Sequence, residues 1–202
     1  KSRGVVNAVS FPPSVRDMRP WNWANFETHV NYSYYITIPY NYGAADRSVR
    51  KNIKKAVNLG YVCERTSRMI DVHGCLQSTA DRQDFDYRLT VEDLELCESL
   101  LGREVFRSYV CYAPNGEAAS SRVVLCYPQS TAVDWVAGTK SEHLKSGCTQ
   151  LLISFVLDDL AGAKVSGFDY AGANIPNVAA AKATWGGILT PYYAIRQPNA
   201  RS

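Results

Sequence analysis

The order of strand-like and helix-like segments constrains the fold of this chain more than any other feature of its sequence. Runs rich in β-branched and aromatic residues predict strands, and apolar residues spaced three and four apart predict helices. After an N-terminal segment, the predicted order is strand, helix, short strand, helix, three strands, helix, strand, helix and strand. Asn115-Gly116, a strong hairpin signal, separates the first two of the three consecutive strands. The order predicts an α/β (α+β) domain with a mixed, mostly antiparallel sheet flanked by helices.

The limits of the predicted elements follow from prolines, glycines and capping residues. Residues 1–31 contain three prolines and predict an extended arm, which a strand at 32–40 continues. Residues 1–40 are therefore expected to be an arm and strand that can belong to a neighbouring unit, and 41–202 to be the domain itself. Residues 65–86 are predicted to be irregular. The other strands are predicted at 61–64, 105–112, 122–127, 132–137, 165–170 and 188–195, and the helices at 47–59, 90–102, 144–161 and from the N-cap Asn174 to Gly186.

The composition of the chain excludes several classes of protein. Its 202 residues are 46% hydrophobic and carry a net charge of +3, which fits one globular domain and excludes a dedicated duplex-DNA binder. No segment reaches the roughly 18 apolar residues of a membrane span. The six cysteines are scattered without a CxxC pair, so we expect no metal site and read them as buried apolar residues in a reducing compartment. These features predict a cytoplasmic protein with no membrane span.

The helix predicted at 47–59 concentrates positive charge on one face. Its apolar positions include Val49, Ile53, Ala56 and Val57. The opposite face carries five basic side chains and no acidic one, namely Arg47, Arg50, Lys51, Lys54 and Lys55. Lysine charges and arginine forks suit phosphate oxygens, although a charge run of this kind is often only a solvated face. Both interpretations remain open.

Familiar catalytic motifs are absent from the sequence. It contains no GxSxG, P-loop, HExxH or GxGxxG pattern, which counts against the common hydrolase, kinase, metalloprotease and Rossmann families. Cys148 follows Ser146-Gly147 near a predicted helix start, where a thiol can be activated. It also continues the apolar stripe of that helix, which favours a place in the core.

Five short motifs occur together in a fixed order. They are 17–23 (Asp-Met-Arg-Pro-Trp-Asn-Trp), 50–56 (Arg-Lys-Asn-Ile-Lys-Lys-Ala), 168–172 (Phe-Asp-Tyr-Ala-Gly), 181–187 (Ala-Lys-Ala-Thr-Trp-Gly-Gly) and 191–193 (Pro-Tyr-Tyr). In these motifs and their order the sequence resembles the Fem-type aminoacyl transferases. The resemblance implies a GNAT (acyl-CoA N-acyltransferase) fold and the transfer of an acyl or aminoacyl group to an amine.

The resemblance also implies the substrates. Fem-type enzymes take the aminoacyl group from aminoacyl-tRNA and pass it to a peptidoglycan precursor, whereas ordinary GNAT enzymes use acetyl-CoA. We therefore expect no tightly bound cofactor, an aminoacyl-tRNA or acyl-CoA co-substrate, and an amine-bearing small molecule or peptidoglycan precursor as acceptor. Two alternatives remain open: an acetyl-CoA-dependent N-acetyltransferase, and a non-catalytic GNAT-fold binding module. Oligomeric state is not determined by the sequence.

Two residues match family positions closest to the chemistry. Lys182 corresponds to a lysine beside the reacting carbonyl, where a cation stabilises negative charge on the oxygen. Its alternative is a solvated helix lysine. Asp169 ends a predicted strand and would orient or deprotonate the amine, or else cap the following turn.

Three further groups of residues are implied as binding elements. The resemblance places Trp185, Tyr192 and Tyr193 along the acceptor channel, although aromatic residues near paired glycines are often core. The basic helix would bind the phosphate of tRNA or of a nucleotide-linked precursor through Arg50, Lys51, Asn52, Lys54 and Lys55. The donor loop would comprise Ser146, Gly147 and Thr149.

The chain departs from the family pattern at two positions and in length. The donor loop keeps one of the usual two glycines, so backbone amides approach a pyrophosphate less closely, which counts against acetyl-CoA. Ala171 stands where relatives often carry Glu. Fem-type enzymes contain two GNAT-like units, and this chain is long enough for one. It is therefore expected to be either a fragment of a two-unit protein or a single-unit relative.

Overall fold

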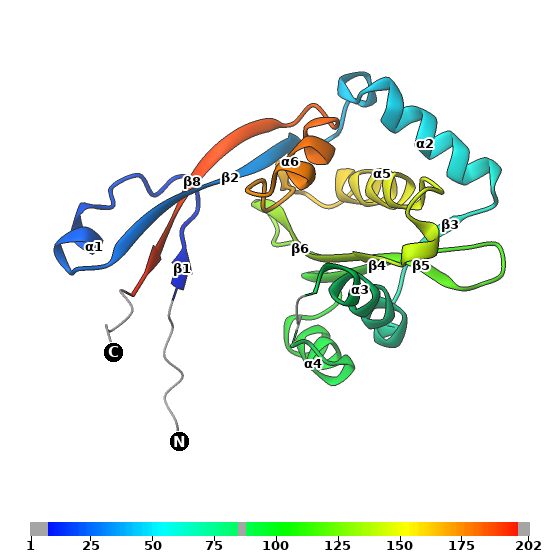
Figure 1. The fold of residues 1–202 in the computed structure, drawn as a ribbon, viewed down its shortest axis with the longest axis horizontal. Helices are drawn as coiled ribbons and strands as arrows, with labels where there is room; N and C mark the ends of the chain where they lie inside the picture. The colour runs from blue at the N-terminus through cyan, green and yellow to red at the C-terminus, as the bar shows by residue number, and fades with distance from the viewer. Residues whose placement is uncertain (1–7, 85–87, 198–202) are drawn as a thin grey trace.

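A single eight-stranded sheet organises the protein (Figure 1). The computed structural model describes residues 8–84 and 88–197. The strand order is β1-β8-β2-β7-β6-β5-β4-β3. Among the described strands, β6 and β7 pair in parallel and every other pairing is antiparallel, which confirms the predicted mixed sheet. The strands are β1 (Ala8–Ser10), β2 (Glu27–Thr37), β3 (Val62–Arg65), β4 (Phe106–Tyr112), β5 (Ala118–Leu125), β6 (Thr131–Thr139), β7 (Gly167–Asp169) and β8 (Ile188–Arg196).

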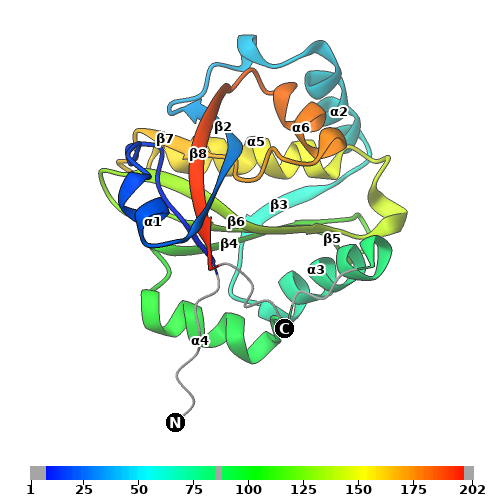
Figure 2. The same cartoon turned by 60° about the vertical axis from the view of Figure 1, so that its left-hand side comes forward.

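Helices cover both faces of the β3–β6 part of the sheet. Figure 1 shows α2 and α5 on one face and α3 and α4 on the other, while Figure 2 shows β2 and β8 running across the direction of β4–β6. Each face has its own buried cluster, with Leu152 and Leu157 in one and Leu76 and Leu94 in the other. The helices are α1 (Arg19–Trp23), α2 (Arg47–Asn58), α3 (Met69–Gln83), α4 (Val91–Leu101), α5 (Cys148–Ala161) and α6 (Pro176–Ala183), with short 3-10 turns η1 (Tyr42–Ala44) and η2 (Ser141–His143).

Local sequence features position several of these elements as expected. α2 coincides with the predicted helix at 47–59, and β4 and β5 form the predicted hairpin around Asn115-Gly116. Thr90 caps α4, because its hydroxyl accepts a hydrogen bond from the Asp93 amide (3.1 Å) while the Asp93 carboxylate accepts one from the Thr90 amide (3.0 Å). Such a reciprocal cap satisfies two amides that the helix itself cannot.

The prediction of an irregular segment at 65–86 was wrong. α3 occupies residues 69–83 of it and is buried against β5 and β6 along one face. The buried positions follow helical spacing, but three of them are the small residues Cys75, Thr79 and Ala80, which do not register as an apolar stripe. The end of the predicted segment, at 85–86, lies outside the described residues.

Several element limits also differ from prediction. β2 begins at Glu27 instead of residue 32, and helix α5 begins at Cys148 because η2 and a glycine turn precede it. Asn174 does not cap α6; its side chain accepts a hydrogen bond from the Tyr32 amide (2.8 Å), and Ile175 is the N-cap. β2 lies inside the sheet between β8 and β7, and the division at residue 40 remains a prediction.

Two further observations concern membrane-spanning helices and the cysteines. Within the described parts of the chain, no helix has the length and apolar character needed to cross a bilayer. All six cysteines are free thiols.

Candidate functional site

The parallel strands β6 and β7 separate after three residue pairs. They pair from Thr131↔Gly167 to Val133↔Asp169, after which β6 continues to Thr139 while the chain beyond Asp169 turns away from β6. Ala171 and Gly172 make this departure with φ values of 45° and 37°. Ligands of α/β proteins commonly bind where neighbouring strands part at their carboxyl ends. This divergence is therefore the first place to look for a site.

A cavity of about 520 Å³, here called the Lys182 cavity, lies at the divergence. Its walls come from α3, β6, the segment after β7, the start of α5, and α6. The charged and polar side chains among its lining residues include Arg82, Arg122, Asp134, Thr149, Tyr170 and Lys182. Segments far apart in sequence thus place four charged side chains around one space.

Lys182 projects from α6 against the segment that follows β7. Its Nζ donates to the carbonyl oxygen of Tyr170 (2.5 Å) and to that of Ala171, and lies 4.8 Å from the centre of the Tyr170 ring. Burial lowers the pKa of Lys182 to about 8. The side chain is therefore not the solvated helix lysine of the alternative interpretation. An ammonium has three protons, so one remains for a ligand.

Arg122 and Asp134 form a buried ion pair in the same cavity. Their side chains join through Nη1 and Oδ2, and the two residues are only 6% and 5% exposed. Arg122 also stacks over the Tyr170 ring at 5.1 Å. Burial raises the pKa of Asp134, and the positive charges of Arg122 and Lys182 oppose that rise. Sequence analysis missed this pair, although a charged residue in the middle of the apolar run 132–137 is a detectable signal.

A second cavity, here called the Asp169 cavity, has a volume of about 640 Å³. Its lining includes residues 10–14, Ser33, Tyr35, Asp169 and Tyr192. The carboxylate of Asp169 accepts hydrogen bonds from the hydroxyls of Ser33 and Tyr35 (2.7 Å for Tyr35) and from the Ala171 amide (2.8 Å). Burial and this carboxylate raise the pKa of Tyr35. Ala171 and Gly172 line both cavities, so the two meet at this segment.

The predicted aromatic residues separate into different environments. Tyr192 lines the Asp169 cavity. Tyr193 is the next residue along β8, so its side chain points to the opposite face of the sheet. Trp185 is 1% exposed and packs against Tyr40 in the core, with ring centres 5.9 Å apart. The expectation that Trp185 lines an acceptor channel is corrected, because its ring has no surface left for a ligand.

The basic residues of α2 are exposed, and none of them lines either cavity. Arg50 donates to the carbonyl oxygens of Ala45 (2.5 Å) and Tyr42 (3.3 Å), which ties its guanidinium to the turn before the helix. Lys55 donates to the carbonyl oxygen of Lys145 (2.6 Å). Lys51 and Lys54 extend from the exposed surface between these two contacts. The basic face thus lies next to the donor loop and outside the Lys182 and Asp169 cavities.

Most contacts of the donor-loop residues are with neighbouring backbone and hold the start of α5 in place. Ser146 Oγ donates to the His143 carbonyl (2.7 Å) and accepts from the Cys148 amide (3.0 Å). Gly147 has φ 91°, and a Cβ there would lie 2.2 Å from the Asn52 carbonyl oxygen, so this glycine permits α5 to pack on α2. Thr149 alone of the three lines the Lys182 cavity, with its hydroxyl 3.0 Å from that of Thr139.

Cys148 lies in the core. It is fully buried, and burial raises the pKa of its thiol. Both observations oppose the activated-thiol interpretation.

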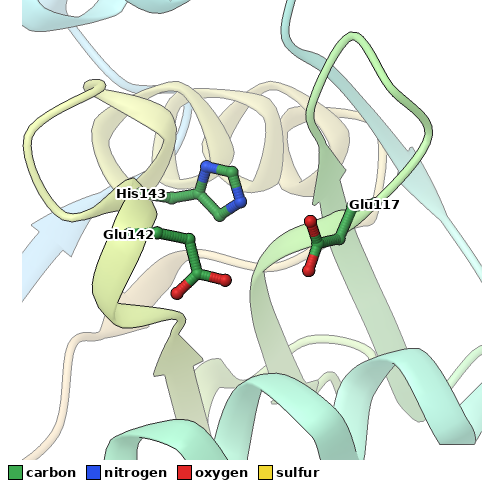
Figure 3. Close-up of side chains that lie close together, drawn as sticks. All are labelled: Glu117, Glu142 and His143. Atoms are coloured by element: carbon green, nitrogen blue, oxygen red, sulfur yellow. The ribbon is translucent and has the colours of Figure 1, made fainter.

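A cluster on another surface was not predicted from the sequence. Figure 3 shows the carboxylates of Glu117 and Glu142 near the imidazole of His143, and one possible ligand atom from each lies within 4.8 Å of the others. Tyr61 OH lies 2.8 Å from His143 Nδ1, and Lys140 Nζ forms an ion pair with Glu117 at 2.6 Å. The ammonium already supplies positive charge there, so an ion-pair network accounts for the exposed carboxylates.

Comparisons with known proteins identify the fold. The sequence matches no protein-family model and no curated protein. FemX superposes on 80% of the chain with TM-score 0.70 at 10% identity, and the C-terminal domain of a putative lysylphosphatidylglycerol synthetase from Agrobacterium fabrum on 89% with TM-score 0.64 at 10% identity. A tandem GNAT protein from the clavulanic acid biosynthesis pathway superposes on 96% with TM-score 0.59 at 13% identity. The chain has the Fem-like GNAT acyltransferase fold.

The match to the Fem-like fold covers part of the longer structures. The chain spans 61% of FemX, 64% of the synthetase domain and 65% of the tandem GNAT protein. The superpositions establish the shared fold, whereas identities of 10–13% leave the substrates to be argued from the site itself. The chemistry of the two cavities that meet at Ala171 and Gly172 is the basis for that argument.

Proposed function

We propose that this protein transfers an acyl or aminoacyl group to an amine. The observation that carries the proposal is the meeting of two cavities at Ala171 and Gly172, one containing the Lys182 ammonium and the other the Asp169 carboxylate. Acyl transfer needs a positive group where the carbonyl oxygen becomes negative and an acceptor for the N–H of the attacking amine. The two cavities supply these groups on either side of one short segment.

On the donor side, Lys182 stabilises the reacting carbonyl. The amine nitrogen attacks the carbonyl carbon, the new C–N bond forms, and the bond from that carbon to the carrier oxygen or sulfur breaks. The remaining Lys182 N–H donates to the carbonyl oxygen as it becomes negative. With its pKa at about 8, the side chain is still mainly protonated at pH 7 and can serve as this donor. The proton lost by the amine balances the proton gained by the leaving group.

On the acceptor side, Asp169 orients the amine. A carboxylate accepts about four hydrogen bonds, and three positions are taken by Ser33, Tyr35 and the Ala171 amide. The fourth is available to an amine N–H. Because three donors fix the carboxylate, it holds the nucleophile in one orientation. Amine-bearing small molecules and peptidoglycan precursors are the acceptors that fit the Fem-like fold.

We further propose aminoacyl-tRNA as the donor, with acyl-CoA as the alternative. The donor loop packs on the basic helix at Gly147, and the carbonyl of the preceding Lys145 accepts a hydrogen bond from Lys55. Thr149 of the loop and the nearby Leu144 line the Lys182 cavity. A polyanion bound along Lys51, Lys54 and Lys55 would therefore lie beside the donor cavity. Gly147, the glycine left in the loop, is buried and packs against α2. A charged-tRNA donor would place the reaction in the cytoplasm.

Separate titrations with aminoacyl-tRNA and acetyl-CoA test the donor, using calorimetry and a transfer assay. The acceptor probe is a nucleotide-linked muramyl pentapeptide with a free lysine amine, and mass spectrometry detects the product. We expect product from aminoacyl-tRNA. We also expect a loss of about 100-fold in kcat/KM for Asp169→Asn, because the neutral amide holds the attacking amine less firmly in its reactive orientation. Tight acetyl-CoA binding without tRNA binding would make the donor assignment wrong. Binding of tRNA without transfer to any amine would favour the binding-module alternative.

A further inference from the structure

Asp134 presents an unpaired carboxylate oxygen to the Lys182 cavity. The residue is 5% exposed and lines that cavity from β6. Arg122 holds Oδ2, while Oδ1 is buried without a hydrogen-bond partner among the described residues. Leaving a buried polar atom unpaired is costly, more so for a charged group. The free oxygen therefore calls for a hydrogen-bond donor from whatever fills the cavity.

The surroundings of Asp134 define the chemistry of that donor. The Lys182 ammonium is held by the carbonyls of Tyr170 and Ala171, and Arg82 donates to the Thr139 carbonyl (3.0 Å). Asp134 and Lys182 both line this cavity, and the Asp134 charge acts on Lys182 across it. A ligand between them meets one N–H donor on Lys182 and one acceptor on Asp134.

An α-aminoacyl group is complementary to this pair. Its carbonyl oxygen accepts a hydrogen bond, and its ammonium, on the next carbon, donates one. An acetyl group has the carbonyl but no hydrogen-bond donor for Asp134. We propose that Asp134 Oδ1 binds the ammonium of the donor's acyl group, so that the cavity selects aminoacyl over simple acyl donors. This inference rests on the proposed acyl transfer and adds the residue that distinguishes its donors.

Binding of two stable donor analogues tests Asp134 without requiring chemistry. One is adenosine carrying alanine through a 3′ amide, and the other carries 2-hydroxypropionate, in which a hydroxyl replaces the amine. Hydrogen bonds to charged groups are worth about 1.5–3 kcal/mol, so calorimetry should give about 10- to 100-fold tighter binding of the alanyl compound to the wild type. Equal affinities, or no binding of either compound, would overturn the inference.

The variant Asp134→Asn tests whether Asp134 causes the preference for the alanyl compound. Asparagine has the same shape and can still accept from Arg122, so the preference should fall to about threefold or less by loss of the charge-assisted bond. Asp81→Asn, at an exposed position of α3, is the control and should keep the full preference. A preference retained in a folded Asp134→Asn protein contradicts the assignment. If that variant does not fold, the wild-type comparison decides.

A transfer assay separates this inference from the proposed function. Alanyl-tRNA and 2-hydroxypropionyl-tRNA are offered to the wild type under the same conditions. Faster transfer from alanyl-tRNA supports both proposals, and equal transfer rates contradict the role of Asp134 alone. Preferential binding of the alanyl analogue with no transfer contradicts the proposed function while supporting Asp134 as an ammonium site.

Discussion

Replacing Lys182 by methionine should change how stability depends on pH. The pKa of Lys182 is lowered from 10.5 to about 8, because its ammonium is largely removed from water. Each tenfold change in proton affinity is worth about 1.4 kcal/mol, so the charged form is disfavoured by about 3 kcal/mol, or about 2 kcal/mol after allowance for its partial exposure. Below pH 8 the wild type bears this cost in full. Between pH 8 and 10.5 the folded protein has lost the proton while the unfolded chain retains it, and the cost disappears.

Urea unfolding of wild type and Lys182→Met at pH 7 and pH 10 measures this effect. The free energy of unfolding of the wild type, relative to the variant, should rise by about 2 kcal/mol between the two pH values. Ionisation of groups away from residue 182 affects both proteins and cancels in the comparison. Lys51→Met, at an exposed position of α2, is the control and should show no such trend. A difference between wild type and Lys182→Met that does not change with pH would refute the buried ammonium.

Three further predictions concern packing, capping and thiol chemistry. Gly147→Ala places a Cβ 2.2 Å from the Asn52 carbonyl oxygen at φ 91° and should lower the free energy of unfolding by more than about 2 kcal/mol. The control Gly116→Ala, at φ 82° with nothing within 4 Å, should lower it by about 1 kcal/mol. Similar urea midpoints for the two variants would contradict the α2–α5 contact. Thr90→Ala removes the reciprocal cap of α4 and should lower the free energy of unfolding by about 1 kcal/mol, while an unchanged value would mean that the cap contributes nothing. Iodoacetamide at pH 8 should label the partly exposed Cys63 and Cys97 before the four buried cysteines. Burial protects those thiols and raises the pKa of Cys75, for example, to about 12. Peptide mapping that finds Cys75 labelled first would contradict this prediction.

The fold was predictable from sequence where local chemistry is strong. The periodicity of α2, the capping box at Thr90 and the hairpin at Asn115-Gly116 each specify structure within a few residues. α3 was missed because its buried stripe includes small residues, whose burial depends on close packing against β5 and β6. Gly138 illustrates that packing, since a Cβ there would lie 2.3 Å from the Cys75 carbonyl oxygen. Such contacts between distant segments leave little periodic trace in the sequence.

The candidate site was only partly predictable for a similar reason. The motif match selected Lys182 and Asp169, which the structure places in adjoining cavities. It did not select Arg122, Asp134 or Ser33, whose positions depend on which strands become neighbours. It also selected Trp185, whose burial follows from the packing of the segment after α6 against Tyr40. A motif identifies residues in sequence, but tertiary packing decides which of them face the cavity.

The central claim is that Lys182 stabilises the reacting carbonyl in an acyl transfer to an amine. The most direct measurement is a single-turnover assay that follows a labelled aminoacyl group from tRNA to the muramyl pentapeptide amine, with wild type and Lys182→Met compared at pH 7. Loss of a charged donor to the developing oxyanion predicts a rate at least 100-fold lower for the variant. Equal rates in two folded proteins would contradict the account.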